Sequence, residues 1–259
     1  MRALLAYPTM FVMTLLLGIP VIVVSLMRVR IDPDSLLGRA PRLWGRTVLR
    51  AAGVRLALHG TEHIAPPGQA RVYVSNHVSW FEIFGLAAIL PRCRFVAKKE
   101  IAALPIFGRA AGEVAAIFID RGNRKAAFDS YADAAGKMKG GTSVVVFPEG
   151  TRGYSYALRP FKKGPFVLAI AAQAPVVPVV SRGTREIQAK GQVAIHSGVC
   201  ELTFLEPIPT AGMTYDDRER LMNIVWHRMA AELERAGARG DEHTEAGRQP
   251  SAGALPHEP

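Results

Sequence analysis

The sequence predicts an α/β fold, in which a mostly parallel mixed sheet is flanked by helices and preceded by an apolar helical segment. Short apolar runs that are continuous rather than alternating indicate strands buried on both faces, as parallel sheets require. Stretches with helical character separate these runs, and such alternation is typical of an α/β sheet. The expected strands are residues 72–74, 94–97, 115–119, 143–147 and 176–180. The expected helices between them are residues 80–90, 99–111, 123–138 and 163–173.

The first apolar stretch, residues 3–27, contains no charged side chain and is long enough to cross a bilayer as a helix. Pro8 and Pro20 leave two forms open: a kinked spanning helix, or two short helices that dip into one leaflet and return. A cleaved signal peptide is disfavoured because the apolar part is too long and no small-residue cleavage site follows. Seven arginines then occur between positions 28 and 55 against two aspartates, which places this side in the cytoplasm beside anionic headgroups.

The last third of the chain predicts further strands and one long helix. Residues 192–204 predict one or two further strands, and the edge of the sheet is one place for them. Pro178 suggests that residues 176–180 form an edge strand or contain a bend. Residues 215–235 form an amphipathic pattern with one apolar side, made of Met222, Val225, Trp226, Met229 and Leu233. We therefore expect a membrane-embedded helical segment at residues 1–30, an α/β domain at 31–236 and a disordered tail at 237–259.

Composition narrows the classes of partner. The 259 residues carry a formal net charge of +10, which suits nucleic acid, anionic lipid or a phosphorylated substrate. Much of the positive charge follows the apolar N-terminal segment, and no basic stretch is interleaved with aromatic residues, so we expect no nucleic-acid partner. The two cysteines, Cys93 and Cys200, lie far apart in apolar runs. They suggest buried thiols in a reducing compartment and offer no spacing for a metal site.

Residues 75–82, Ser-Asn-His-Val-Ser-Trp-Phe-Glu, form the boundary between an expected strand and an expected helix. Ser79 and Glu82 have the spacing of a capping box, in which each side chain satisfies an N–H at a helix start. With Ser79 as the cap, His77 lies in the loop, and the Glu82 carboxylate can approach one imidazole nitrogen. The other nitrogen is then free to accept a proton from a substrate hydroxyl. The alternative is structural: Glu82 only caps the helix and His77 is only a hydrogen-bonded loop residue.

Polar motifs also follow two other expected strands, Asp-Arg-Gly-Asn-Arg at residues 120–124 and Pro-Glu-Gly-Thr-Arg-Gly at residues 148–153. Ligands of open α/β sheets bind beyond the carboxyl ends of the strands, so neighbouring parallel strands would bring these loops into one cleft. A guanidinium cluster there suits a phosphate monoester, and glycines allow close approach of the backbone. The cleft would hold a base (His77), an acid (Glu82 or Glu149) and the guanidinium groups of Arg121, Arg124 and Arg152. The alternatives are a surface ion pair within residues 120–121 and an ordinary polar turn at residues 149–152.

Four stretches in this order resemble the motif blocks of the glycerolipid acyltransferases. They are residues 76–82, residues 117–121 (Ile-Phe-Ile-Asp-Arg), residues 147–152 (Phe-Pro-Glu-Gly-Thr-Arg) and residues 176–179 (Val-Val-Pro-Val). More narrowly, the chain is similar to the bacterial 1-acyl-sn-glycerol-3-phosphate acyltransferases, over roughly residues 72–180. One position departs from the family pattern, because Glu82 stands where the family usually has aspartate.

The resemblance implies transfer of a fatty acyl group from acyl-CoA or acyl-carrier protein to the sn-2 hydroxyl of 1-acyl-glycerol-3-phosphate, giving phosphatidic acid. It implies His77 as general base, oriented by Glu82, and no metal or cofactor, since the thioester supplies the driving force. Besides the thioester donor, the implied partners are membrane lipids and the lysophospholipid, at the cytoplasmic face of the cell inner membrane. The implied substrate-binding residues are Lys98, Arg121, Glu149, Gly150, Thr151, Arg152 and Lys162.

Three other functions remain open at this point. The first is acyl transfer to another acceptor, such as glycerol 3-phosphate, a lyso-ornithine lipid or another lysophospholipid. The second is a thioester or lipid hydrolase that uses the same base to activate water. The third is a non-catalytic protein that binds the membrane surface.

Overall fold

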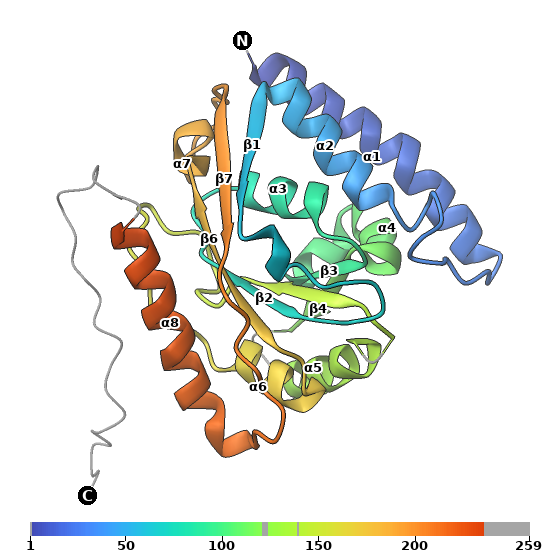
Figure 1. The fold of residues 1–259 in the computed structure, drawn as a ribbon. Coiled ribbons are helices and arrows are strands. Elements are labelled where there is room, and N and C mark those ends of the chain that lie inside the picture. The colour runs from blue at the N-terminus through green and yellow to red at the C-terminus, as the bar shows by residue number, and fades with distance from the viewer. Residues whose placement is uncertain (1, 121–123, 139, 236–259) are drawn as a thin grey trace, which may run out of the picture.

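A seven-stranded sheet forms the centre of the protein in the computed structural model, which describes residues 2–120, 124–138 and 140–235 (Figure 1). The strand order is β1-β7-β6-β2-β5-β3-β4, and all neighbours are parallel except the antiparallel pair β6 and β7. The mostly parallel mixed sheet that the sequence predicts is therefore confirmed. The strands are β1 (Val54–His59), β2 (Val72–Ser75), β3 (Cys93–Lys98), β4 (Ala116–Ile119), β5 (Ser143–Val146), β6 (Val176–Arg182) and β7 (Gly198–Phe204).

Helices cover both faces of the sheet (Figure 1). The helices are α1 (Ala3–Leu26), α2 (Ala40–Ala52), α3 (Phe81–Ile89), α4 (Phe107–Val114), α5 (Arg124–Met138), α6 (Gly164–Ala172), α7 (Thr184–Ile187) and α8 (Arg218–Arg235). The described residues also form three short 3₁₀ helices, η1 (Thr61–His63), η2 (Lys99–Ala103) and η3 (Tyr215–Asp217). Because successive side chains of a strand point to opposite faces, Val72 and Val74 pack with α5, α6 and α8, whereas Tyr73 packs with α2, α3 and α7. The molecule thus has one core on each side of the sheet.

All five predicted strands are present, but the edge of the sheet is not where the sequence suggested. β7 takes only the second half of residues 192–204, and it lies between β1 and β6. The edge position is wrong for β7 because β1, which was not predicted, pairs with it along its whole length. β6 is internal as well, although it contains Pro178. The missing N–H is tolerated because the ladder to β7 begins only at Val179, while the Pro178 carbonyl accepts the N–H of Leu205.

Most predicted helices are present within one or two residues of their expected bounds. The single helix expected at residues 99–111 is wrong, since the chain forms η2, breaks, and begins again as α4. Pro105 lacks an N–H and restricts the residue before it, and Ile106 adopts a positive φ of 61°, so a continuous helix is excluded there. The apolar side predicted for residues 215–235 is confirmed in α8, where Met222, Val225, Met229 and Leu233 are buried and Trp226 is partly buried.

α1 is one continuous helix of 24 residues that contains both Pro8 and Pro20, so the alternative of two short helices is wrong. Among the described residues it is the one helix long and apolar enough to cross a membrane. It packs on α2 and α4 through Ala6, Gly18 and Val21, and leaves most of its other apolar side chains exposed. The Tyr7 hydroxyl accepts a hydrogen bond from Gln188 Nε2 at 2.8 Å, which joins α1 to the segment after β6. The length and composition of α1 suit membrane association.

Candidate active site

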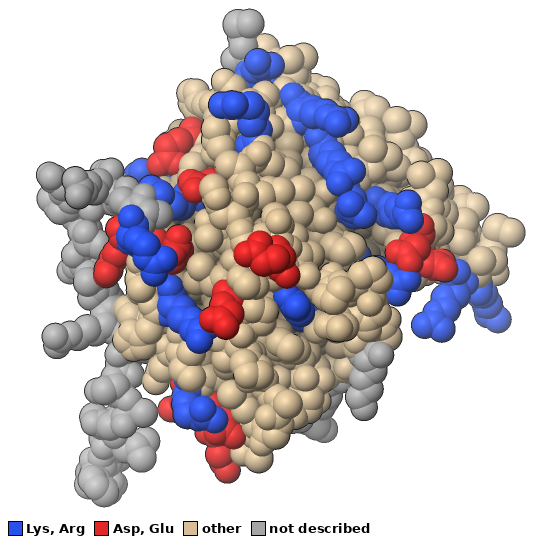
Figure 2. Space-filling model, viewed as in Figure 1, with Lys and Arg blue, Asp and Glu red and all other residues tan. Residues whose placement is uncertain are grey.

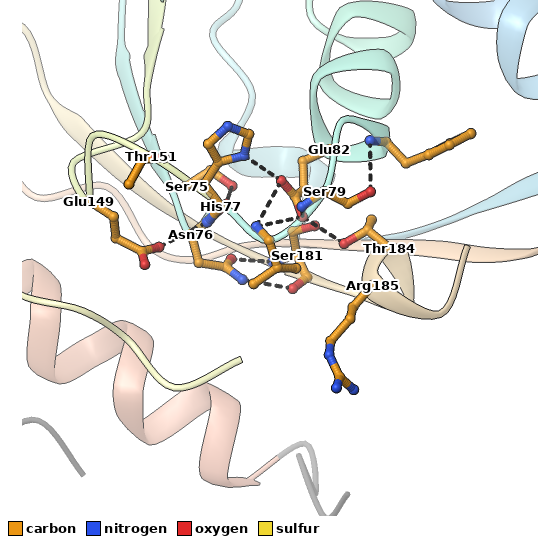
Figure 3. A network of polar contacts seen from close by, with 12 residues as sticks. Ser75, Asn76, His77, Ser79, Glu82, Glu149, Thr151, Ser181, Thr184 and Arg185 are labelled. Atoms are coloured by element: carbon orange, nitrogen blue, oxygen red, sulfur yellow. Dashed lines mark hydrogen bonds and ion pairs between the residues drawn. The ribbon is translucent and has the colours of Figure 1, made fainter. Parts of the chain in front are cut away.

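His77 lies in the loop that connects β2 to α3, at the carboxyl edge of the sheet, as predicted (Figure 3). The preceding residue, Asn76, is buried and fixes this loop to β6. Its side-chain amide donates to the carbonyl of Ser181 at 3.0 Å and its side-chain oxygen accepts the Ser181 N–H at 2.7 Å. A buried amide that both donates and accepts a hydrogen bond is satisfied in only one orientation. Asn76 therefore fixes the position at which the loop that carries His77 begins.

The imidazole of His77 is paired with the Glu82 carboxylate, and Nδ1 lies 2.7 Å from Oε2. Glu82 is fully buried and its oxygens also accept the backbone N–H groups of Val78 and Ser79, so it acts as an acceptor throughout. In the neutral ring, Nδ1 therefore carries the proton and Nε2 has the free lone pair. The ring stacks on Phe147, with centroids 4.1 Å apart, and 12% of the His77 side chain is exposed. This geometry presents one unprotonated nitrogen to a ligand.

The capping box predicted for Ser79 and Glu82 is half correct. Glu82 Oε1 accepts the Ser79 N–H at 2.8 Å, as a capping box requires. The Ser79 hydroxyl, however, donates to the carbonyl of Gln188 at 2.7 Å, and α3 begins two residues later with Trp80 at its N-cap. The Ser79 hydroxyl oxygen also accepts the N–H of Phe81, the first residue of α3, at 3.3 Å, so Ser79 meets the helix start from one position before the N-cap. Glu82 is thus a partner of His77 as well as of the loop backbone, which answers the alternative in which it is only a cap.

The loop after β5 lies against the His77 loop because β2 and β5 are paired neighbours. Gly153 donates its N–H to the carbonyl of His77 at 2.7 Å. From the same loop, Glu149 Oε1 accepts the N–H of His77 at 2.9 Å. The imidazole ring and the Glu149 carboxylate lie on opposite sides of the His77 backbone (Figure 3). Two hydrogen bonds therefore hold the main chain of His77 from both of its peptide groups.

Glu149 is 5% exposed and does not line the cavity described below. Burial raises the pKa of its carboxyl group to about 7. The neighbouring Glu82 charge acts in the same direction, whereas the hydrogen bond from the His77 N–H and the charge of Arg159 oppose the rise. The structure brings Glu149 next to His77, but to its backbone rather than to its ring.

Arg152 lies beside the pair of His77 and Glu82, called the dyad below. Its guanidinium is 4.7 Å from the centre of the Trp80 ring. The stacked ring holds a cation in place without neutralising it. Burial lowers the pKa of Arg152 from its ordinary value, although Glu82 opposes this effect. Gly150 has a φ of 78°, a conformation that favours glycine, and this turn places Thr151 and Arg152 at the cavity that His77 also lines.

The remaining predicted binding residues are not all gathered at this point. Lys98 lines the cavity at the end of β3, while Lys162 is exposed, and the cavity lining does not include it. Arg121 lies outside the described residues, and the structure does not describe the side chain of Arg124. Asp120, just before them, pairs with Lys99 Nζ at 2.6 Å. The three loops were expected to follow neighbouring strands. This is confirmed for the loops after β2 and β5, whereas β4 lies at the edge of the sheet and is separated from β5 by β3.

An apolar cavity of about 450 Å³ opens at the dyad. Its walls come largely from α1, α2, α3 and α4, and His77, Gly150, Thr151 and Arg152 also line it. Phe107, from the kinked segment after η2, is among the apolar lining residues. The volume is typical of a small-molecule site that has a few polar groups in a hydrophobic lining. The arrangement can hold an apolar chain in the cavity and present its polar end to a base and a cation.

Two residues of this site were not predicted. Trp80 stacks on Arg152, and Thr184 donates its hydroxyl to Glu82 Oε1 at 2.7 Å. Thr184 had an available signal, since it follows β6 in the same way that His77 and Glu149 follow their strands.

Comparison with known proteins agrees with the fold and with the family that the sequence motifs resemble. The acyltransferase family model matches residues 55–182, and the chain belongs to this family. The 1-acyl-sn-glycerol-3-phosphate acyltransferase alpha of Homo sapiens is 37% identical over 179 residues, which cover 68% of this chain and 63% of the human protein. The 1-acyl-sn-glycerol-3-phosphate acyltransferase of Cocos nucifera is 31% identical over 183 residues, 70% of this chain and 58% of the relative. The chain thus spans less than two thirds of the length of these curated relatives.

The crystal structure of the 1-acyl-sn-glycerophosphate (LPA) acyltransferase PlsC from Thermotoga maritima has the same fold. It superposes with a TM-score of 0.69 at 22% sequence identity, covering 90% of this chain and all of the other. The fold of this chain is therefore that of the Thermotoga maritima protein over 90% of its length.

Proposed function

We propose that this chain transfers a fatty acyl group from acyl-CoA or acyl-carrier protein to the sn-2 hydroxyl of 1-acyl-glycerol-3-phosphate, giving phosphatidic acid. The observation that carries the proposal is the pairing of His77 with the buried Glu82 at an apolar cavity that Arg152 also lines. Curated relatives named for this reaction support it. A phosphate-bearing acceptor is favoured over a lyso-ornithine lipid because Arg152 offers a guanidinium to it.

In the proposed reaction, Nε2 of His77 takes the proton of the acceptor hydroxyl as its oxygen attacks the thioester carbonyl. The C–O bond forms and the carbonyl electrons move to oxygen, which gives a tetrahedral intermediate. When the intermediate collapses, the C–S bond breaks and the leaving thiolate recovers the proton from His77. Glu82 holds the ring in the required tautomer and stabilises its protonated form. Near His77, the Ser79 hydroxyl is engaged with Gln188, which argues against an acyl-enzyme on that serine.

Substrate binding follows from the lining of the cavity. Arg152 and, as a prediction from the sequence, Arg121 bind the acceptor phosphate, because guanidinium groups donate paired hydrogen bonds to phosphate oxygens. Gly150 and Thr151 present backbone to the same head, and the cavity holds an acyl chain. Lys98 and Lys162 stay predicted contacts of the polar ends of the substrates. For Glu149, its contact with the His77 N–H favours a role in holding the catalytic loop over the predicted contact with substrate.

The proposed location is the cell inner membrane, with the site on the cytoplasmic face. α1 supplies the apolar surface, and basic side chains form a row over the region of α2 (Figure 2). This helix carries Arg42, Arg46 and Arg50, spaced four residues apart along one side. Like charges at this spacing destabilise a helix unless anions lie nearby, as phospholipid headgroups do. The absence of any metal or cofactor requirement stays a prediction.

The test is incubation of the detergent-solubilised protein with a labelled acyl thioester and one acceptor at a time, followed by lipid separation. The acceptors are 1-acyl-glycerol-3-phosphate, glycerol 3-phosphate, lyso-ornithine lipid and none. We expect labelled phosphatidic acid with the first. Label transferred only to another acceptor would replace the proposed substrate, and thioester consumed without an acceptor would indicate a hydrolase. No consumption under any condition would favour a protein that only binds the membrane surface.

A further inference from the structure

We propose that Thr184 is a positioning residue, whose hydroxyl holds the Glu82 carboxylate with Oε2 facing Nδ1 of His77. This inference rests on the proposed acyl transfer and adds a residue to it. The starting observation is that Glu82 is fully buried, so each of its oxygens needs donors from the protein. The described donors are the His77 ring, the N–H groups of Val78 and Ser79, and the Thr184 hydroxyl.

These donors differ in where they come from. The ring and the two backbone groups belong to residues 77–79, which lie within five positions of Glu82 in the segment that leads into α3. Thr184 lies 102 positions further along the chain, on α7 after β6. Among the described contacts of the carboxylate, the hydroxyl of Thr184 is thus the one that ties it to a different strand of the sheet.

The two oxygens of Glu82 share one donor, the Val78 N–H, and otherwise have different partners. Oε1 accepts the Thr184 hydroxyl at 2.7 Å and the Ser79 N–H at 2.8 Å. Oε2 lies 2.7 Å from Nδ1 of His77 (Figure 3). Because a carboxylate rotates about its last bond, two strong donors on Oε1 determine the direction in which Oε2 points.

The position of Thr184 is itself fixed by the backbone around it. Gly183 has a φ of 71°, and a Cβ there would lie 2.0 Å from the carbonyl oxygen of Val199. Only glycine therefore permits the turn that brings Thr184 under Glu82. At the other end of α7, the Gln188 carbonyl accepts the Ser79 hydroxyl at 2.7 Å. The segment from Thr184 to Gln188 consequently contacts the start of α3 and the residues before it at two points, and Thr184 is buried at one of them.

The test compares Thr184→Val, which keeps the shape of the side chain and removes the donor, with Thr184→Ser, which keeps the donor. Thr210→Val is the matched control, because Thr210 is also buried and its hydroxyl has no described hydrogen-bond partner. We expect Thr184→Val to lower kcat by about 10- to 100-fold, the effect of a misaligned catalytic group, with the KM for both substrates unchanged. Thr184→Ser should retain most of the activity and Thr210→Val all of it. If Thr184→Val does not fold, Thr184→Cys takes its place with the same expected loss, since a thiol is a weak donor.

A double-mutant comparison separates positioning from a general structural role. In a Glu82→Gln background, Thr184→Val should cause no further loss of kcat, because the group through which Thr184 acts is already altered. A loss of equal size in both backgrounds, or wild-type kcat in Thr184→Val, would overturn the inference.

A readout without turnover keeps the inference distinct from the proposed function. If the wild type and Thr210→Val transfer no acyl group to any acceptor, the proposed function fails. The resonance of the His77 Nδ1–H in ¹⁵N-histidine-labelled protein, assigned with His77→Ala, then tests Thr184 directly. We expect this resonance to shift or broaden in Thr184→Val and to stay in place in Thr210→Val. An unchanged resonance in Thr184→Val would contradict the role assigned to Thr184.

Discussion

The Glu149 carboxylate accepts the backbone N–H of His77 at 2.9 Å, so the loop after β5 holds the main chain of the loop after β2. The contact is buried, and burial raises the pKa of Glu149 to about 7. Glu149 therefore affects two properties. It helps to position the loop that carries His77, and it changes the number of protons that the folded protein binds.

This coupling predicts a pH dependence of stability. In the unfolded chain Glu149 loses its proton near pH 4.5, whereas in the folded protein it keeps the proton to about pH 7. The folded state thus binds the extra proton between these values, and its contribution to the free energy of unfolding is lost as the pH rises through this window. The effect is on the order of 3 kcal/mol. Glu149→Gln removes it, so thermal unfolding should show the variant gaining Tm relative to wild type from pH 5 to pH 8.

The control for this experiment is Glu206→Gln, which changes an exposed glutamate at the surface. Its Tm difference from wild type should be the same at both pH values. A Tm difference for Glu149→Gln that stays constant from pH 5 to pH 8 would show that Glu149 does not titrate in this window.

His77→Ala should retain the fold and lose most turnover. The base is removed while the buried partners of the loop stay, and a well-placed general base contributes ~10²–10⁴ in rate. Acyl transfer is measured with purified protein in detergent or membranes, and Tm is measured in parallel. His59→Ala serves as control, because His59 is exposed and pairs with Glu201 away from the cavity. Full activity of His77→Ala would refute the assignment of the base.

Glu82→Asp tests why a glutamate occupies this position. The backbone at Glu82 is held by the buried Phe81 and Phe84 of α3, so a side chain shorter by one methylene cannot follow its partners. We expect kcat to fall by about tenfold or more at unchanged KM, because the carboxylate loses alignment with His77 or with Thr184. Glu201→Asp makes the same change in a surface pair with a histidine and should leave kcat at its wild-type value. Wild-type kcat in Glu82→Asp would mean that the loop adapts to either acid.

Arg152→Ala should chiefly raise the KM for the lysophospholipid acceptor. Loss of a charge-assisted hydrogen bond of about 1.5–3 kcal/mol corresponds to roughly 10- to 100-fold in binding. Arg152→Lys should recover part of this loss, since it keeps the charge without the paired donors. Steady-state kinetics with each substrate varied in turn provide the measurement, and Arg235→Ala on the exposed side of α8 provides the control. An effect confined to the acyl donor would contradict the assigned role.

The central strands and the His77 loop could be predicted because both signals are local. Val72 to Val74 form a continuous apolar run, and the residues that follow carry the polar groups of a strand end. β1 gave no such signal. It is an edge strand whose Arg55 and His59 are exposed, so its residues do not read as buried. The pairing of β1 with β7 joins residues about 145 positions apart, a relationship that no local pattern contains.

The contacts of the site also differ in whether a local sequence pattern predicts them. The approach of Glu82 to His77 follows from five positions of sequence and one helix start, and the structure has both. The contacts of Glu149 with the His77 backbone and of Thr184 with Glu82 depend on which strands are neighbours in the sheet. That order, with β2 between β5 and β6, comes from the packing of the whole chain. The sequence therefore indicated the contact between His77 and Glu82 more reliably than the contacts that hold these two residues in place.

Tyr7 of α1 gives the N-terminal helix a structural task within the protein. Its hydroxyl accepts from the Gln188 side chain, and the Gln188 carbonyl accepts from Ser79, two residues beyond His77. Truncating the helix to obtain a soluble protein would thus also remove a contact that supports the candidate active site. An inactive truncation would therefore not, by itself, prove that the chemistry needs a bilayer.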